Sequence, residues 1–335
     1  MPAGELMILF MNDRRKGRLV LMIVYLIAFS LGFWVSTVSY YPILVKSAVA
    51  VGVIVAIIFM GSLDFNNSSV FDAYWSVVPP LMVLYYLVLV ITEQSLAVAN
   101  KTPGAVTLTL NSTCFDFPGL RDRLLDSPRI IILFLLTAAY SVRLTWNFLH
   151  SWPGLKHEDW RYLNFRRKSG KAYWVMSFFG LHFFPALMVF GGTLSIWVVV
   201  VHDFHPLNPL DVIAVFVTTG AILIEAVADS QLRKFVTLNK ESGKTMKRGL
   251  WAFSRHPNYL GEILFWWGLY LFAVASNPYI WWVIIGPVAI TLMFLSASIP
   301  MIEKRMLERR VDYREYMKRV PMLIPWKIFS KKVNG

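Results

Sequence analysis

Residues 174–201 read WVMSFFGLHFFPALMVFGGTLSIWVVVV and contain no Asp, Glu, Lys or Arg. A helix that crosses a bilayer needs about 20 apolar residues, because every backbone polar group must be satisfied inside the segment. This stretch is long enough to cross. The whole chain agrees, since 56% of its 335 residues are hydrophobic and only 16% are charged, against roughly 25% charged in soluble domains. The composition therefore excludes an ordinary soluble fold.

Seven other stretches of the chain have the same apolar character. With residues 174–201 they give eight predicted spans: Leu19–Ser36, Pro42–Met60, Val77–Ile91, Ile130–Leu149, Trp174–Val201, Leu210–Ala228, Tyr259–Ala275 and Tyr279–Pro300. The first is expected to be a true span rather than a cleavable signal, because its apolar run is too long and no small-residue cleavage site follows. The sequence predicts an all-α, polytopic membrane protein with about eight transmembrane helices.

The chain has a net charge of +13, and its basic residues are unevenly distributed along the sequence. Lys and Arg gather at the ends of apolar segments, as in membrane proteins, so we do not expect binding to nucleic acid. With eight spans, 27 of the 33 basic residues fall on one side of the membrane. The positive-inside rule then places both termini in the cytosol. The loop from Gly61 to Ser76, on the same side, is an exception because it carries Asp64 and Asp72 and no base.

Cys114 is the only cysteine, so neither a disulfide nor a thiolate metal site is expected, and no other metal site is predicted. Asn111-Ser-Thr113 matches the glycosylation acceptor pattern, which also arises by chance.

Polar residues at membrane depth indicate where function lies, because an ionisable side chain in a span is costly. Glu225, Asp229 and Arg233 recur at every fourth position at the end of the sixth span, so they share one helical face. Such a stripe is typical of a cavity wall. A salt-bridge ladder that seals the helix bundle explains the same spacing.

A second polar cluster, Ser254-Arg-His-Pro-Asn-Tyr-Leu-Gly-Glu262, enters the seventh span. Asn258 and Glu262 lie one turn apart, Gly261 permits close approach of another group, and Arg255 at a helix N-terminus suits an anion. The alternative is that Arg255 and His256 only anchor the helix at the interface.

A third cluster has two parts. Asp72-Ala-Tyr-Trp75 lies at the start of the third span, and Tyr140, Arg143 and Asn147 share one face of the fourth span. A buried tyrosine held by a carboxylate is a good hydrogen-bond donor to a carbonyl oxygen that becomes negative during a reaction. The structural alternative is that Asp72 caps the third helix while Arg143 extends to the interface.

These residues resemble those of the steroid 5α-reductase superfamily, in particular its branch of uncharacterised membrane reductases. The resemblance covers about residues 68 to 328. Its motifs are Asp72-Ala-Tyr-Trp-Ser, Arg143-Leu-Thr-Trp-Asn, His157-Glu-Asp-Trp-Arg-Tyr162, Glu225-Ala-Val-Ala-Asp229-Ser-Gln-Leu-Arg233, Gly249 to Glu262, Tyr313-Arg-Glu-Tyr316 and Leu323-Ile-Pro-Trp326.

The resemblance implies a reductase with seven conserved helices, in the endoplasmic reticulum of a eukaryote or the inner membrane of a bacterium. The first predicted span is then an N-terminal addition to this seven-helix core. Along the chain, we expect N-terminal transmembrane helices over residues 1–60 and a reductase-like membrane domain over 61–330. NADPH enters from the cytosol and binds in the part from about 210 to 330. The implied cofactor-binding residues are Glu225, Asp229, Arg233, Lys244, Arg255, His256, Asn258, Tyr259 and Glu262.

The same resemblance assigns Tyr140 and Asp72 to catalysis, with Trp75, Arg143 and Asn147 near the substrate. We expect hydride transfer from NADPH to the β-carbon of an α,β-unsaturated ketone, a steroid or a related lipid enone. The main alternative is an S-adenosylmethionine-dependent isoprenylcysteine carboxyl methyltransferase, which shares the Arg255-His256-Pro-x-Tyr259 junction and for which Glu303 is a candidate residue. A non-enzymatic sterol-binding membrane protein is the other.

Overall fold

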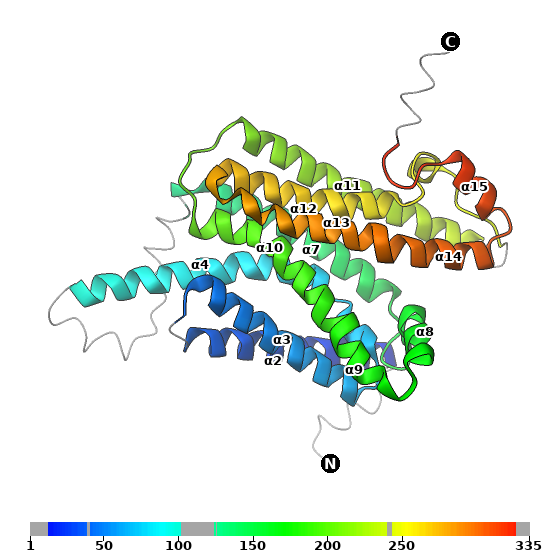
Figure 1. Ribbon diagram of the computed structural model, residues 1–335, viewed down its shortest axis with the longest axis horizontal. Coiled ribbons are helices and arrows are strands. Elements are labelled where there is room, and N and C mark those ends of the chain that lie inside the picture. The colour runs from blue at the N-terminus through cyan, green and yellow to red at the C-terminus, as the bar shows by residue number, and fades with distance from the viewer. Residues whose placement is uncertain (1–12, 39–40, 102–123, 125, 240–242, 326–335) are drawn as a thin grey trace, which may run out of the picture. The chain divides into compact units, whose positions relative to one another are not determined.

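The fold is known from a computed structural model, which describes residues 13–38, 41–101, 124, 126–239 and 243–325, and only the backbone of 94–101. These residues form helices and no strand (Figure 1). Among them, eight helical segments are long and apolar enough to span a membrane: Asp13–Thr37, Ile43–Asp64, Ser68–Glu93, Pro128–Ser151, Trp160–Val201, Pro209–Leu238, Pro257–Ser276 and Pro278–Arg309. The predicted all-α, polytopic membrane fold is therefore confirmed.

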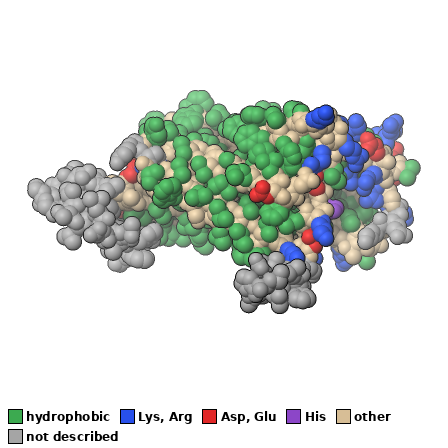
Figure 2. All heavy atoms as spheres, turned by 90° about the horizontal axis from the view of Figure 1, so that it is seen from below, with side chains coloured by type: hydrophobic (Ala, Val, Ile, Leu, Met, Phe, Trp, Pro, Cys, Tyr) green, Lys and Arg blue, Asp and Glu red, His purple; other side chains and the backbone are tan. Residues whose placement is uncertain are grey.

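The predicted and observed spans correspond one to one, with different ends. The third begins near Ser68 rather than Val77, because a helical turn leads into the helix ahead of Pro79. Figure 2 shows apolar side chains over most of the visible surface and Lys and Arg gathered in one region of it. Which side of the membrane holds the termini stays a prediction. Asn111, Cys114 and Trp326 lie outside the described residues.

The chain divides into two compact units, Met1–His202 and Asp203–Gly335. The predicted boundary near residue 60 stays a prediction. The described elements of unit 1 are α2 (Asp13–Thr37), α3 (Ile43–Asp64), η1 (Ser68–Phe71), α4 (Tyr74–Lys101), α7 (Pro128–Ser151), α8 (Trp160–Ser169), η2 (Gly170–Ala172), α9 (Tyr173–Ser177), η3 (Phe178–Phe183) and α10 (Phe184–Val201).

The core of unit 1 is formed by α4 and α10. They contact each other, and each also packs on α7. In the spans that contain them, 61% of the residues in the most apolar window are buried, against 33% for α2. Helices that are apolar on every side suit such a central position.

Two arginines of α2 hold the C-terminal end of α7. Arg18 donates to the Leu149 carbonyl (2.6 Å), and Arg14 donates to the carbonyls of Leu149 and His150. The last carbonyls of a helix have no partner within it, and they carry the negative end of its dipole. These two arginines at the start of α2 therefore also cap α7.

Two short π-helical segments interrupt the spans. One is η3 in unit 1, and the other is η6 (Phe294–Ser298) in unit 2. Each ends two residues before a proline, Pro185 and Pro300. Proline has no N–H to donate, and its ring clashes with the carbonyl four residues earlier, so the wider turn relieves both conflicts.

Unit 2 is organised around a close helix pair. Its described elements are α11 (Pro209–Leu238), η4 (Gly249–Ala252), α12 (Pro257–Ser276), η5 (Pro278–Ile284), α13 (Ile285–Met293), η6, α14 (Ile299–Arg309) and α15 (Tyr313–Arg319). A capping box between Asn208 and Asp211 starts α11. Gly261 of α12 lies against α11 so closely that a Cβ there would be 2.7 Å from the Ala221 carbonyl oxygen. Small residues permit this approach between membrane helices.

Candidate functional site

In unit 1, the polar residues gather around η1, which lies between α3 and α4. Asn67 caps η1 by accepting a hydrogen bond from Ser69 N (2.8 Å). From α2, Tyr25 donates to the carbonyls of Val70 (3.1 Å) and Phe71 (3.3 Å). Asp72 follows directly, so its position is fixed from two sides.

The partner of Asp72 on α8 is Tyr162, whose hydroxyl donates to Asp72 Oδ1. Tyr162 is 7% exposed and Asp72 is half-buried. The neighbouring Arg161 donates through its Nε to Asp159 (2.7 Å), and the Asp159 N–H donates to Ser69 Oγ (2.9 Å). The start of α8 is thereby attached to η1, and Asp72 is held in a site formed by two motifs about 90 residues apart.

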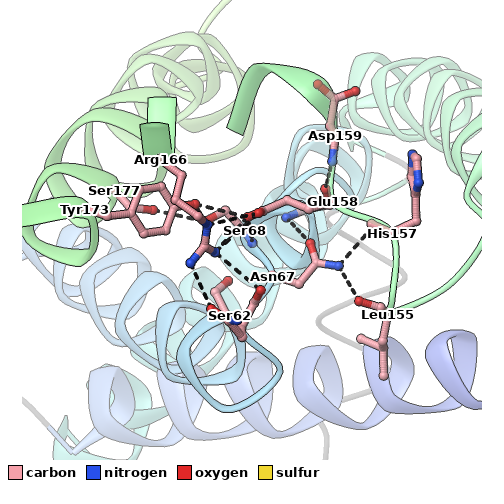
Figure 3. A network of polar contacts seen from close by, with 12 residues as sticks. Ser62, Asn67, Ser68, Leu155, His157, Glu158, Asp159, Arg166, Tyr173 and Ser177 are labelled. Atoms are coloured by element: carbon pink, nitrogen blue, oxygen red, sulfur yellow. Dashed lines mark hydrogen bonds and ion pairs between the residues drawn. The ribbon is translucent and has the colours of Figure 1, made fainter. Parts of the chain in front are cut away.

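Glu158 is the centre of a larger network next to this pair (Figure 3). It accepts from Ser68 N (2.9 Å) and from the Tyr173 hydroxyl (3.0 Å), and it forms an ion pair with Arg166 (3.2 Å). Ser68 Oγ also lies 3.1 Å from Ser177 Oγ. A buried carboxylate with this many partners is satisfied, so the network is a rigid support for η1.

The other predicted residues of unit 1 lie on α4 and α7, which pack together. Tyr140 is fully buried, and the Arg143 guanidinium lies 5.8 Å from its ring centroid. Asn147 and Trp75 are half-buried. A hydrogen bond from Thr145 to Ser76 (2.7 Å) fixes the register of the two helices.

In unit 2, the stripe on α11 meets the junction at the start of α12. Asn258 Nδ2 donates to Asp229 Oδ1 (3.3 Å), and buried Glu262 accepts from Trp266 Nε1 (3.0 Å). Glu225 is buried where Gly261 approaches α11. The two predicted clusters therefore form one polar seam between α11 and α12.

Arg255 and His256 are both bound to Glu303 of α14. The Oε1 atom of Glu303 lies 2.7 Å from Arg255 Nε and 3.0 Å from His256 Nε2. Arg255 also donates to the carbonyls of Met317 (3.0 Å) and Val320 (2.8 Å). These bonds attach the C-terminal segment to the start of α12. Because Glu303 balances its charge, Arg255 has a positioning role in the structure.

A cavity of about 160 Å³ lies beside this seam. Its walls include Trp251, Tyr259 and Tyr313, and its polar lining includes Asn258 and Lys244. The Tyr259 ring stacks on His256 at a centroid distance of 5.6 Å. Burial raises the pKa of Tyr313, so its hydroxyl stays protonated at neutral pH.

The loop that carries Lys244 is attached to the C-terminal segment through Asp312. This carboxylate accepts from Thr245 Oγ1 (2.6 Å) and pairs with Lys247 Nζ (2.6 Å). Partial burial alone raises the pKa of Asp312, but the hydrogen bonds from Lys247 and Thr245 outweigh that effect and lower it.

The predicted cofactor residues are partly brought together. Five of the nine line the cavity: Lys244, Arg255, His256, Asn258 and Tyr259. Glu225, Asp229 and Glu262 lie on the α11–α12 seam, while Arg233 is exposed on α11. Within the described residues, no group of three or more His, Cys, Asp or Glu side chains has the arrangement to hold a metal ion.

Sequence reasoning did not assign a role to Tyr162 or Tyr25, and it considered Glu303 only for the methyltransferase alternative. Tyr162 stands in a motif that the sequence analysis quotes, so its polar aromatic character beside Asp159 was a usable signal. The contact from Tyr25 joins elements 45 residues apart, which periodicity does not reveal.

Comparison with known proteins gives a family and one relative. The sequence profile of the family described as "Protein of unknown function (DUF1295)" matches residues 104–320. Uncharacterized protein C594.04c of Schizosaccharomyces pombe is 27% identical over 222 residues, covering 59% of this chain and 64% of that protein. The match thus spans less than two thirds of the relative's length. No solved structure matches the chain.

Proposed function

The chain belongs to the DUF1295 family of proteins of unknown function, and we propose that it is an NADPH-dependent membrane reductase. In this proposal it belongs to the steroid 5α-reductase superfamily. Its substrate is an α,β-unsaturated ketone of a lipid, such as a steroid. The basic helix ends face the cytosol in this proposal. The membrane is the endoplasmic reticulum in a eukaryote or the inner membrane in a bacterium.

The observation that carries the proposal is the hydrogen bond between Asp229 and Asn258 (3.3 Å) at the edge of the cavity. The two residues come from separate motifs, and the superfamily resemblance gives both to the cofactor. In the structure they meet beside the aromatic walls of the cavity. A salt-bridge ladder alone explains neither the amide of Asn258 as the partner of Asp229 nor the cavity beside it.

The cavity suits part of a dinucleotide. Its volume of about 160 Å³ is below the roughly 300–1,000 Å³ of pockets that enclose a whole ligand, so it matches a single ring system. Trp251 and Tyr259 offer flat apolar faces, and Lys244 and Arg310 in the lining supply positive charge for phosphate. The residues present therefore fit NADPH, which when bound supplies a hydride.

Unit 1 supplies the groups that act on the substrate carbonyl. Negative charge grows on that oxygen as the β-carbon accepts a hydride, so a buried phenol stabilises the transition state more than the ground state. We assign this donor role to Tyr140. In this proposal Asp72 is the carboxylate that orients Tyr140. The hydroxyl of Tyr162 holds Asp72 in place through a hydrogen bond. A proton from water then adds to the α-carbon, so the C=C bond is reduced to a single bond.

One observation favours a second candidate function, the isoprenylcysteine-type carboxyl methyltransferase. The resemblance to those enzymes rests on Arg255, His256, Tyr259 and Glu303, and the structure brings Glu303 against both Arg255 and His256. The methyltransferase alternative does not use Asp229 or Tyr140. We therefore rank the reductase first.

The test uses the full-length protein purified in detergent. NADPH at about 100 times its dissociation constant should stabilise the folded state by about 2.7 kcal/mol, seen as a rise in unfolding temperature, while S-adenosylmethionine should not. Asn258→Ala should reduce the rise, and the exposed Asn164→Ala on α8 serves as the matched control. Stabilisation by S-adenosylmethionine alone would favour the methyltransferase, and stabilisation by neither ligand would overturn both proposals.

A further inference from the structure

A second cavity, of about 350 Å³, opens at one end of unit 1. It is lined by the turn at Asn66 and Asn67, the loop from Leu155 to Glu158, and Leu163 and Arg166 of α8. This volume lies within the range typical of ligand pockets. The proposed reductase chemistry uses none of these residues.

The walls of this cavity are held in place by hydrogen bonds. Asn67 Nδ2 donates to the carbonyls of Leu155 (2.7 Å) and His157 (3.0 Å), and Arg166 donates to Asn66 Oδ1 (2.9 Å). In Figure 3 the His157 ring points away from the network, whereas Asn67 and Arg166 point into it. The cavity is therefore a preformed site.

The charge of the site is positive. Glu158 is balanced by Arg166 (3.2 Å), so the acid in the lining is neutralised. Lys156 is exposed in the lining, and exposed Arg167 lies on the same face of α8 as Leu163, one turn later. Within the described residues, neither basic side chain has an ion-pair partner. Asp13 accepts from Lys156 N (3.3 Å), and four bases follow it on α2: Arg14, Arg15, Lys16 and Arg18.

The position of the cavity relates it to the bilayer surface. α8 is the first part of the segment Trp160–Val201, which is long and apolar enough to span a membrane. After α8, Val175, Met176 and Phe179 of that segment are 64%, 49% and 59% exposed, as expected of residues that contact lipid. Leu163 adds an exposed apolar side chain at the cavity itself. The lining thus places the exposed base Lys156 near the exposed apolar side chain of Leu163.

We propose that this cavity binds the phosphate-bearing headgroup of an anionic phospholipid. Lys156 and Arg167 neutralise the phosphate, and Asn66 and His157 offer polar contacts to the rest of the headgroup. A basic pocket at the end of membrane helices is suited to such lipids, because each Lys or Arg near the surface strengthens the interaction. The site is separate in function from the proposed reductase chemistry, so either proposal can fail alone.

The test measures phosphatidylglycerol and phosphatidylcholine binding to the full-length protein by native mass spectrometry. The wild type should retain phosphatidylglycerol preferentially, and Lys156→Gln/Arg167→Gln should bind it about 25-fold more weakly, at about fivefold for each cation. The control is Arg314→Gln/Lys318→Gln on α15, which removes the same charge from exposed positions in unit 2. Lys156→Arg/Arg167→Lys should restore the preference.

Each other outcome overturns the proposal. Equal binding of the two lipids would exclude a headgroup site. An equal loss in the α15 control would show that only net charge matters. Inorganic phosphate that displaces the lipid at equal concentration would identify a site for soluble anions instead. Unfolding temperature, measured on every variant, separates a lost site from a lost fold, and the conservative double variant provides the decisive comparison if the neutral one is unstable.

Discussion

Substitution of Gly261 by alanine should separate α11 from α12. A Cβ at this position would lie 2.7 Å from the Ala221 carbonyl oxygen and 3.0 Å from Glu225 N. Both are backbone atoms in the middle of a helix, so neither can rotate away. To reach an ordinary contact of 3.4 Å, the helices must move apart by the difference between 3.4 and 2.7 Å, which is 0.7 Å.

This movement has two measurable effects. Overpacking of this kind costs about 1–3 kcal/mol, and at about 2–4 °C per kcal/mol the unfolding temperature should fall by about 2–12 °C. The bond between Asn258 and Asp229 is already 3.3 Å long. A further 0.7 Å takes it out of hydrogen-bonding range, so stabilisation by NADPH should weaken as well.

The assay is thermal unfolding in detergent, followed by tryptophan fluorescence, with and without NADPH. Gly220→Ala is the matched control on the facing helix, because a Cβ there meets no atom within 4 Å. Alanine is also the better helix former, so the control should not lower the unfolding temperature. If Gly261→Ala unfolds at the wild-type temperature, the close approach of these helices is not the constraint that we infer.

Three further predictions concern the site residues. Tyr140→Phe should lower turnover of a lipid enone about 10²–10³-fold, as loss of an oxyanion donor does, while stabilisation by NADPH remains. Tyr162→Phe should lower stability by about 1.5–3 kcal/mol, because it removes a hydrogen bond to the carboxylate of Asp72. The third concerns Asp312, whose pKa is lowered in the fold by Lys247 and Thr245. Its carboxylate should stabilise the protein above the unfolded pKa of about 3.9, and this stability should be lost as pH falls through the folded pKa. The unfolding temperatures of wild type and Asp312→Asn, measured between pH 3 and 6, will test this.

Each of these predictions has a contrary result. Unchanged turnover in Tyr140→Phe would remove that residue from the chemistry. Wild-type stability in Tyr162→Phe would mean that its hydroxyl does not hold Asp72. If the difference in unfolding temperature between wild type and Asp312→Asn grows toward acidic pH, the pH dependence has the opposite sign to the one predicted.

The fold was largely predictable because membrane spans are specified by local composition. Eight apolar stretches predicted eight spans, since within hydrocarbon a helix is the structure that satisfies its own backbone. The ends were less predictable. Whether a helix begins at Tyr74 or Val77 depends on η1, which is held by Tyr25 and other residues distant in sequence.

The candidate site was predictable where residues share a helix face. Helical spacing correctly placed Asp229 one turn after Glu225, and Asn258 one turn before Glu262. The pairing of Asn258 with Asp229 depends on how α12 packs on α11, which spacing does not determine. Likewise, the choice of Tyr162 as the partner of Asp72 depends on the path of the chain between α7 and α8.

The two π-helical segments affect how relatives of this chain should be aligned. A π turn holds one residue more than an α turn, and one residue rotates a helix by about 100°. Side chains before Phe178 and after Phe183 therefore face directions that a continuous α-helix would not give them. A homologue without the proline at position 185 should align here with a gap of one residue. The position of this gap in the alignment decides whether the tyrosine equivalent to Tyr173 remains opposite Glu158.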